Sequence, residues 1–260
     1  MSRIPSVKSP PSALLTDVWY TLVYYPRAER DRIEALRAKT WFRALTEAGL
    51  SPVRARAAIR RIGRESRASE RQGRTLPLDE QIRAVGKVTG TELEVLELVD
   101  RFDAIIEKHP PRVARGAQAT LRVVRARGIR VGVVSNVVFE RGTGARRLLR
   151  RLGLHRFSDT IVLSADDGIA KPDPRPFCRC LRELAVEPAD AWYLGDQPTD
   201  IIGALAAGVH PVRFVGLARF GPRVSSDVPV SRSVPVLRRW SDLLPMVNGA
   251  GARNGCRGAT

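Results

Sequence analysis

Residues 13–22, ALLTDVWYTL, decide the fold of this chain. The first four have the pattern of a short buried strand, and Asp17 follows that strand directly. A second apolar run at 191–194 is followed closely by Asp196, with Asp200 four residues farther on. Open α/β sheets bind their ligands beyond the carboxyl ends of the strands. These carboxylates therefore predict a ligand site at one edge of a parallel sheet.

The second half of the chain alternates between helical and strand patterns. Strands that alternate with helices predict a parallel sheet with right-handed crossovers, which is an α/β fold. We expect strands at 13–16, 130–134, 160–163, 191–194 and 212–215, and helices at 117–127, 146–152, 175–184 and 201–207.

Between the first strand and the rest, residues 27–108 are almost entirely helical in pattern and contain no convincing strand. Breaks are expected near 49–52, 73–77 and 86–90, where Gly and Pro gather. We therefore predict a core formed by two separate segments, an inserted all-helical region and two disordered tails. Their bounds are 12–26 and 114–244 for the core, 27–113 for the insert, and 1–11 and 248–260 for the tails.

Composition limits the class of protein. The chain has 260 residues and 43% hydrophobic residues, which is enough for a buried core. No apolar stretch approaches the roughly 18 residues of a membrane span, and the N-terminus lacks the apolar region of a secretory signal. Cys178, Cys180 and Cys256 do not form a disulfide framework, and the first two should point to different faces of one helix. We expect a reducing, cytoplasmic setting and a monomer or homodimer.

The formal net charge is +17, mostly from an excess of Arg. A positive field speeds the association of anions, so a small phosphorylated substrate would fit. The excess equally fits an Arg- and Ala-rich composition that has no function of its own. Charge alone does not identify nucleic-acid binding, because the chain has no recognisable nucleic-acid module and only 6% aromatic residues.

Polar residues follow four of the predicted strands and should meet in one crevice. In chain order they are Asp17, Ser135 with Asn136, Lys171, and Asp196 with Asp200. Carboxylate oxygens suit Mg²⁺, which usually takes one or two carboxylates and keeps some water. A carboxylate beside a divalent ion and a lysine can accept a phosphoryl group and form an aspartyl-phosphate. The pattern favours phosphoryl transfer.

Four ordered motifs resemble those of the haloacid dehalogenase (HAD) superfamily, and the likeness covers residues 13–215. Each motif alone is weak, whereas four in order at predicted strand ends are specific. The resemblance implies a Rossmann-like core, a helical cap inserted after the first motif, and a Mg²⁺-dependent hydrolase, most often a phosphatase. The motifs are Asp17…Thr21-Leu22, Ser135-Asn136, Lys171-Pro172-Asp173 and Gly195-Asp196…Asp200.

The resemblance also implies a role for each motif residue. Asp17 would be the nucleophile, assisted by Ser135 and Lys171. The metal ligands would be Asp17, the backbone carbonyl of Trp19, Asp196 and Asp200, and the substrate would be bound by Thr21, Ser135, Asn136 and Lys171. Asp200 could instead only cap the helix that follows it, although both functions can coexist.

The chain departs from the family pattern at Trp19. Family phosphatases usually carry there a second Asp, which protonates the leaving group, and such help is typically worth about 10²–10⁴-fold in rate. Four explanations stay open: a substrate with a good leaving group, an acid from the cap, other chemistry such as 2-haloacid dehalogenation, or a binding protein on the same scaffold. The haloacid dehalogenases have an aromatic residue at this position but work without the metal site that Asp196 and Asp200 suggest.

Substrate specificity should lie in the predicted cap. Five arginines recur at helical spacing and form one stripe, which either clamps an anionic substrate or faces solvent. Candidates for an acid from the cap are Glu47, Glu65 and Asp79, and nothing in the sequence selects among them. Tyr24 and Tyr25 are expected at the site entrance, and Trp41 with Phe42 in the cap core. The arginines are Arg60, Arg64, Arg67, Arg71 and Arg74.

Overall fold

A parallel sheet of six strands forms the centre of the computed structural model, which describes residues 10–221 and 234–248. The strand order is β5-β4-β1-β6-β7-β8, and every neighbouring pair is parallel. The predicted α/β class is therefore confirmed. The strands are β1 (Ala13–Thr16), β4 (Arg130–Ser135), β5 (Thr160–Leu163), β6 (Ala191–Gly195), β7 (His210–Phe214) and β8 (Val236–Leu237).

Strand β1 lies in the middle of the sheet, which explains why all four of its residues are apolar or buried. Thr16 pairs with Val133 of β4 on one side and with Leu194 of β6 on the other. This register places the residues that follow the three strands at the same edge of the sheet. It is the edge at which α/β folds bind ligands.

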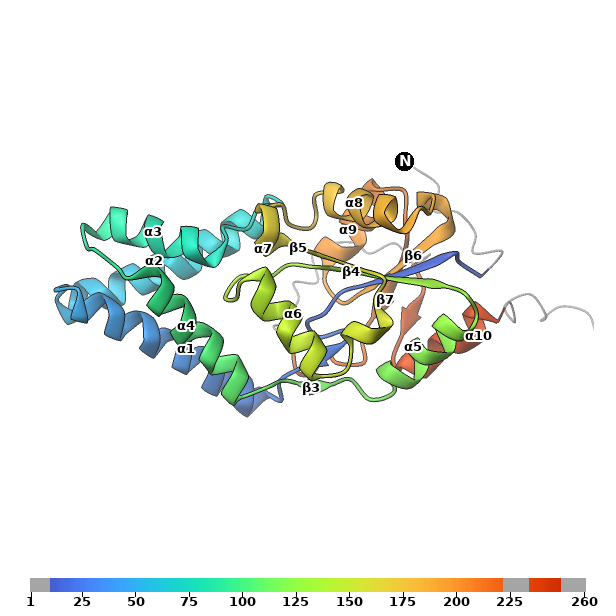
Figure 1. Cartoon of the computed structure of the whole chain (residues 1–260), viewed down its shortest axis with the longest axis horizontal. Coiled ribbons are helices and arrows are strands. Elements are labelled where there is room, and N and C mark those ends of the chain that lie inside the picture. Colours follow the sequence, from blue (N-terminus) through green and yellow to red (C-terminus); the bar gives the residue numbers. More distant parts are fainter. Residues whose placement is uncertain (1–9, 222–233, 249–260) are drawn as a thin grey trace, which may run out of the picture.

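Helices cover both faces of the sheet (Figure 1). On one face, α5 (Ala117–Ala126), α6 (Gly142–Arg151) and α10 (Leu243–Val247) pack against a core that includes Leu14 and Trp192. On the other face, α8 (Arg175–Leu184) and α9 (Pro198–Ala206) pack around Leu15 and Tyr193. Burying both faces of the sheet explains why most residues of its strands are apolar.

Helix α8 lies very close to β4. A Cβ at Gly132 would come within 2.4 Å of the Cys180 sulfur, so only glycine permits this contact. Cys180 is buried while Cys178 is exposed, and the prediction that the two cysteines point to different faces is confirmed. Cys256 lies outside the described residues.

Residues 27–108 form a separate helical lobe, seen on the left of Figure 1. Its helices have a hydrophobic cluster of their own, in which Trp41 packs against Phe102 with ring centroids 5.4 Å apart. Trp41 is buried as expected, whereas Phe42 packs at the edge of the cluster. The helices are α1 (Arg27–Glu47), α2 (Pro52–Arg71), α3 (Leu78–Thr89) and α4 (Val95–Lys108).

Two short strands join the helical lobe to the sheet. β2 (Val23–Tyr24) and β3 (Arg112–Val113) pair in antiparallel fashion at the two ends of the lobe. Strands of two residues carry too little pattern to be predicted from sequence, and neither they nor β8 were expected. The pairing makes the lobe an insertion whose two ends lie side by side.

The break predicted near 86–90 is confirmed, because α3 ends at Thr89 with Gly90 in the left-handed conformation. Gly86 lies inside the helix, where a Cβ would come within 2.8 Å of the Thr91 carbonyl oxygen. Other boundaries differ from the prediction. Helix α6 begins at Gly142, four residues earlier than predicted, and α9 begins at Pro198 rather than Ile201. Proline at the first position of a helix is favourable, so the start of α9 has a physical reason.

The predicted disordered tails, 1–11 and 248–260, lie almost entirely outside the described residues. Within residues 10–221 and 234–248, no helix combines the length and the apolar character required to cross a lipid bilayer.

Candidate active site

The side chain of Lys171 is the centre of the site. Its Nζ donates hydrogen bonds to Asp17 Oδ1 and to Asp200 Oδ1, each at 2.6 Å, and to the Tyr193 hydroxyl at 2.7 Å. All three donors of the ammonium are therefore used, and the side chain is only 3% exposed. Burial lowers the pKa of Lys171, but the two carboxylates outweigh burial and raise it above its ordinary value. Lys171 stays charged.

Asp17, Asp196 and Asp200 form a buried carboxylate cluster, with one oxygen of each within 4.8 Å of the others. Lys171 contacts Asp17 and Asp200, whereas Asp196 Oδ1 finds no hydrogen-bond partner among the residues described. Burial raises the pKa of Asp17 to about 6, although Lys171 lowers it, and burial with repulsion from Asp200 raises the pKa of Asp196 well above its usual range.

Such a cluster is unfavourable by itself, because its carboxylates are buried and repel one another without water to screen their charges. A divalent cation would relieve that repulsion and supply the missing partner of Asp196. Oxygen ligands of this kind suit Mg²⁺. The residues therefore fit a divalent cation such as Mg²⁺, which Asp17, Asp196 and Asp200 would hold. The three predicted carboxylates lie together, and the backbone carbonyl of Trp19 stays a predicted ligand.

The Asn136 side chain forms hydrogen bonds with both the backbone N–H and the backbone carbonyl of Lys171. Its Oδ1 accepts from the Lys171 N–H at 2.9 Å, and its Nδ2 donates to the Lys171 carbonyl at 3.1 Å. The preceding Ser135 ends β4 and is buried. Its hydroxyl has no hydrogen-bond partner of good geometry in the described part of the chain, but it lies close enough to Asp17 to lower the pKa of that carboxyl. Its predicted contact with the substrate stays a prediction.

Thr21 is placed by a tryptophan from the far end of the chain. Trp240 Nε1 donates to the Thr21 carbonyl at 2.9 Å, and this fixes the loop that follows Asp17. The Thr21 hydroxyl is buried and, within the segments the structure describes, has no partner. Thr21 does not line the crevice around Asp17, so its predicted substrate contact stays a prediction.

Asp200 contacts both the start of α9 and Lys171, so the two interpretations of this residue are compatible. Its Oδ2 accepts from the Gln197 N–H at 2.8 Å, which caps the start of α9, and its Oδ1 accepts from Lys171. A Cβ at Gly195 would lie 2.4 Å from Asp200 Oδ2, so the glycine makes room for this carboxylate. Capping and site chemistry coexist because the two oxygens face different donors.

Trp19 packs between the two halves of the molecule. Its ring stacks on Tyr25 with centroids 5.8 Å apart, and it contacts both the sheet core and the core of the helical lobe. Tyr25 lines the crevice as expected, whereas Tyr24 stacks on Phe220 instead. The position of Trp19 thus has a structural role that an aspartate would not supply.

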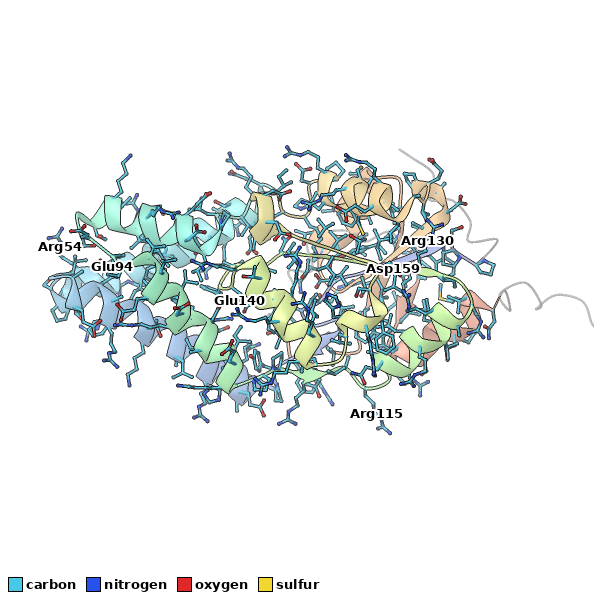
Figure 2. All side chains as sticks on the ribbon, in the orientation of Figure 1. Arg54, Glu94, Arg115, Arg130, Glu140 and Asp159 are labelled. Atoms are coloured by element: carbon cyan, nitrogen blue, oxygen red, sulfur yellow. The ribbon has the colours of Figure 1, made fainter. Side chains whose placement is uncertain are left out.

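A crevice of about 750 Å³ opens beside Asp17, between the helical lobe and the sheet. Glu140, at the junction of the two in Figure 2, forms one wall together with Arg37 of α1, and the two pair at 3.0 Å. The acidic and basic side chains that line the crevice are nearly equal in number. One bound divalent cation would therefore make its net charge positive, which favours the binding of an anion. The charged groups are Arg30, Arg37, Arg67, Arg71 and Lys171, with Asp17, Glu34, Glu70, Glu140, Asp196 and Asp200.

Only part of the predicted arginine stripe faces this crevice. Arg67 and Arg71 line it, whereas Arg60 and Arg64 are exposed on α2 and Arg74 lies beyond the end of that helix. The arginines of α2 share one face of that helix, and only its C-terminal end lies beside the crevice. The stripe is therefore shared between the crevice and solvent.

The acids that were considered for the helical lobe lie elsewhere. Glu47 is exposed and pairs with Arg101, Glu65 pairs with Arg61, and Asp79 pairs with Arg83. None of the three lines the crevice. Instead, the structure brings in two residues that sequence reasoning missed, Glu70 and Tyr193.

Glu70 and Tyr193 gave weak signals in the sequence. Tyr193 is a hydroxyl-bearing residue in an otherwise apolar strand, which suggests a partner in the interior. Glu70 directly precedes Arg71 in the sequence, and the helical spacing of the arginines gives no reason to select an acid between them. Burial raises the pKa of Glu70, while Lys171 and Arg67 lower it.

The sequence profile of the haloacid dehalogenase-like hydrolases matches residues 13–208, about three quarters of the chain. The chain belongs to the haloacid dehalogenase-like hydrolase family. This hydrolase is 36% identical over 143 residues to the bovine haloacid dehalogenase-like hydrolase domain-containing protein 3, which covers 55% of each chain. It is 44% identical over 100 residues to a phosphoglycolate phosphatase of Rhodospirillum rubrum, over 37% of this chain and 39% of that protein.

Solved structures agree on the fold. The family member resembles the 2-haloacid dehalogenase of Pseudomonas syringae with a TM-score of 0.62 and 24% identity, over 92% of this chain and 99% of that one. A likeness at this identity concerns the fold alone. The hydrolase aligns with about half, or less, of the length of these curated relatives.

Proposed function

We propose that this protein is a Mg²⁺-dependent phosphatase that hydrolyses a small phosphate monoester through an aspartyl-phosphate on Asp17. The observation that carries this proposal is the buried group of Lys171, Asp17, Asp196 and Asp200 at the edge of the sheet. It combines a carboxylate nucleophile, a fixed ammonium and ligands for a divalent cation. The phosphatase among the relatives supports the same class of reaction.

In the proposed first step, an oxygen of the Asp17 carboxylate attacks phosphorus and the bond from phosphorus to the ester oxygen breaks. The leaving alcohol takes up a proton. In the second step, water attacks the aspartyl-phosphate, releases inorganic phosphate and restores Asp17. Mg²⁺, when bound, would neutralise charge on the transferring oxygens.

Lys171 would orient the nucleophile in this reaction. Of the two carboxylate oxygens of Asp17, Lys171 donates only to Oδ1, which leaves Oδ2 available. Its charge lies where negative charge develops on the phosphoryl group, and such fixed charges stabilise a transition state strongly because they need no reorganisation. Ser135 contributes a hydroxyl that can donate to the same group.

Glu70 is the carboxyl that we assign to the proton transfers, in place of the aspartate that Trp19 displaces. It comes from α2, lines the crevice together with Asp17, and is electrostatically coupled to Lys171. Its raised pKa favours a protonated form that can protonate the leaving oxygen. The ionised form could then accept a proton from the attacking water.

The helical lobe would act as the cap that closes over the substrate. Arg67 and Arg71 line the crevice from α2 and could contact the phosphate group of the substrate. A cytoplasmic location and a monomeric or dimeric state stay predictions.

Turnover of phosphate esters tests the function. Purified protein is given an activated aryl phosphate and a set of alkyl phosphates, with Mg²⁺ or EDTA. We expect Mg²⁺-dependent phosphate release that Asp17→Asn abolishes and that the exposed control Asp100→Asn leaves unchanged. Phosphate release that persists in Asp17→Asn would refute the proposal.

The same assay tests Glu70. We expect Glu70→Gln to slow alkyl phosphates about 10²-fold and the aryl phosphate much less, because a good leaving group needs no acid. Glu80→Gln is the matched control, since Glu80 is an exposed glutamate of the same lobe. If Glu70→Gln slowed hydrolysis of the alkyl and aryl phosphates equally, Glu70 would not be the general acid.

Dehalogenation is the alternative that Trp19 favours, because an aromatic residue occupies the position of the second aspartate. The carboxylate cluster argues against it, since Asp196 and Asp200 have no evident use in a reaction without metal. Halide release from 2-haloacids, in the absence of any Asp17-dependent phosphate release, would favour dehalogenation over the phosphatase.

A further inference from the structure

A second cavity, of about 190 Å³, lies in the helical lobe between α2 and α3. Apolar side chains supply most of the area of its wall, which also carries the ion pair of Arg61 and Glu65. Two of the apolar side chains, Leu76 and Val88, are 42% and 56% exposed. Large apolar side chains at the rim of a cavity are unfavourable in water and become favourable when a ligand covers them. The apolar wall consists of Ala58, Ile62, Leu76, Ala84, Val85, Val88 and Val138.

Two buried polar groups of this cavity lack partners. Thr75 and Gln81 line it, and each is 4% exposed. Neither Thr75 Oγ1 nor Gln81 Oε1 has a hydrogen-bond partner among the described residues. Buried polar atoms nearly always have partners, so two such atoms in one cavity indicate a ligand that supplies them.

Both groups are fixed in place. Gln81 Nε2 donates to the carbonyls of Leu76 at 2.6 Å and Val138 at 2.7 Å, which leaves the amide oxygen as the unused end. The Thr75 N–H donates to the Gly168 carbonyl at 2.8 Å. The cavity therefore offers a preformed acceptor and a hydroxyl on an apolar wall. This is the usual composition of a small-molecule site.

The cavity adjoins the crevice around Asp17. Glu70 and Val138 line both spaces, so a ligand could extend from one into the other past these two side chains. Glu70 is the residue to which we assign the proton transfers. A phosphate held at Asp17 would have its ester oxygen directed toward Glu70 and the rest of the molecule directed toward the cavity.

We propose that the cavity between α2 and α3 binds the organic part of the substrate, and that this part is a small apolar group that carries a hydroxyl. This inference rests on the proposed phosphatase function. An apolar cavity of about 150 Å³ holds benzene, so a cavity of the present size accepts one ring or a branched chain of about five carbon atoms. The hydroxyl would donate to Gln81 and accept from Thr75.

The reaction is then hydrolysis of the phosphate monoester of such an alcohol. The bond between phosphorus and the ester oxygen breaks, and the alcohol leaves with a proton from Glu70. Water then supplies the fourth oxygen of inorganic phosphate and returns a proton to Glu70. Arg67 and Arg71 lie on the crevice side of Glu70 and do not line the cavity. They would contact the phosphate end.

Binding of two phosphonates tests this assignment without turnover. Isopentylphosphonate and ethylphosphonate carry the same anion and differ only in the apolar chain. We expect isopentylphosphonate to bind at least about tenfold more tightly in isothermal titration with Mg²⁺, because one buried methylene alone can be worth that much. Hydrolysis of isopentyl and ethyl phosphate should show the same preference in kcat/KM.

Filling the cavity should remove the preference. Ala84→Phe adds a ring from α3, where Ala84 is exposed and tolerates a larger side chain, and Ala58→Phe adds one from α2. Both should bring the ratio of the two dissociation constants close to one and leave ethylphosphonate binding unchanged. Ala57→Phe is the control, since Ala57 neighbours Ala58 but does not line the cavity.

The outcomes are distinct. Equal binding of the two phosphonates, or a preference that both filling variants retain, would overturn the cavity assignment and leave the phosphatase proposal intact. A preference without any Asp17-dependent hydrolysis would support the cavity as a binding site and overturn the phosphatase. Failure of both phosphonates to bind, without hydrolysis, would overturn both.

The hydroxyl is tested by one further variant. Thr75→Val keeps the shape of the side chain and removes its hydroxyl. We expect it to weaken binding of a hydroxylated isopentylphosphonate about tenfold and to leave isopentylphosphonate unchanged. Equal effects on both ligands would remove the hydroxyl from the proposed ligand class.

Discussion

Replacing Asp196 by asparagine should stabilise the protein when no metal is bound. Asp196 is buried beside Asp17 and Asp200, and its Oδ1 has no hydrogen-bond partner among the described residues. Lys171 forms ion pairs with the other two carboxylates but not with Asp196. Asparagine keeps the size of the side chain and removes the charge that the site does not balance.

The size of the effect follows from the geometry of the cluster. Two unit charges 4.8 Å apart repel by about 3 kcal/mol at an effective dielectric constant of about 20. The ionisation penalty at pH 7 is limited to about 4 kcal/mol, because a carboxyl that costs more takes up a proton instead. We therefore expect Asp196→Asn to raise the free energy of unfolding in EDTA by about 2 kcal/mol at pH 7.

The pH dependence has a definite sign. The pKa of Asp196 is higher in the folded protein than the usual 3.8, so the folded state prefers the protonated carboxyl. The penalty is absent below the unfolded pKa and grows as pH rises toward the folded pKa. The advantage of Asp196→Asn should therefore vanish below about pH 4 and increase as pH rises toward neutral.

Magnesium should reverse the order of stability. A cation at 100 times its dissociation constant stabilises the folded state by about 3 kcal/mol, and only the parent protein should gain this. Urea denaturation followed by circular dichroism, with EDTA and with Mg²⁺, measures both effects, and the exposed Asp100→Asn is the control. If Asp196→Asn is less stable than the parent in EDTA at pH 7, the reasoning about unbalanced charge is refuted.

Three further predictions concern residues around the crevice. Lys171→Met should abolish phosphate release and, by leaving two buried carboxylates without their cation, lower the free energy of unfolding by about 3–5 kcal/mol in a urea titration. Trp19→Asp should raise turnover of alkyl phosphates at least about tenfold relative to Trp19→Asn, since it restores an acid beside the leaving group; equal rates for both variants would contradict this. Burial raises the pKa of Glu140 to about 7 although Arg37 lowers it, so the ionised form is disfavoured by folding. Stability is thus lost as pH rises from about 4.5 through 7, and Glu140→Gln should add about 3 kcal/mol at pH 8 and nothing at pH 4 in the same denaturation assay.

The sheet and its site were predictable because a polar residue marks the end of each apolar run in the sequence. Asp17, Ser135 and Asp196 are polar residues that directly follow or end apolar runs, and a parallel sheet necessarily brings such ends to one edge. Lys171 was expected at the same edge because its segment follows the predicted strand 160–163, although the short helix α7 (Ser164–Asp167) lies between the strand and the lysine.

Contacts between the helical lobe and the sheet could not be predicted in the same way. Glu70 reaches the crevice because a backbone bridge pairs Arg74 with Ile169, which fixes the end of α2 beside the segment before Lys171. No local pattern encodes a contact between residues about a hundred positions apart. The surface acids Glu47 and Asp79 were equally plausible in the sequence for that reason.

Chemical trapping on Asp17 tests the central claim most directly. The protein is mixed with Mg²⁺ and an aryl phosphate, quenched in acid after a short time, digested and analysed by mass spectrometry. The account predicts a phosphoryl group on the peptide that contains Asp17, in larger amount in Glu70→Gln, because loss of the base slows the attack of water. Rapid phosphate release with no phosphorylated Asp17 peptide in either protein would contradict it.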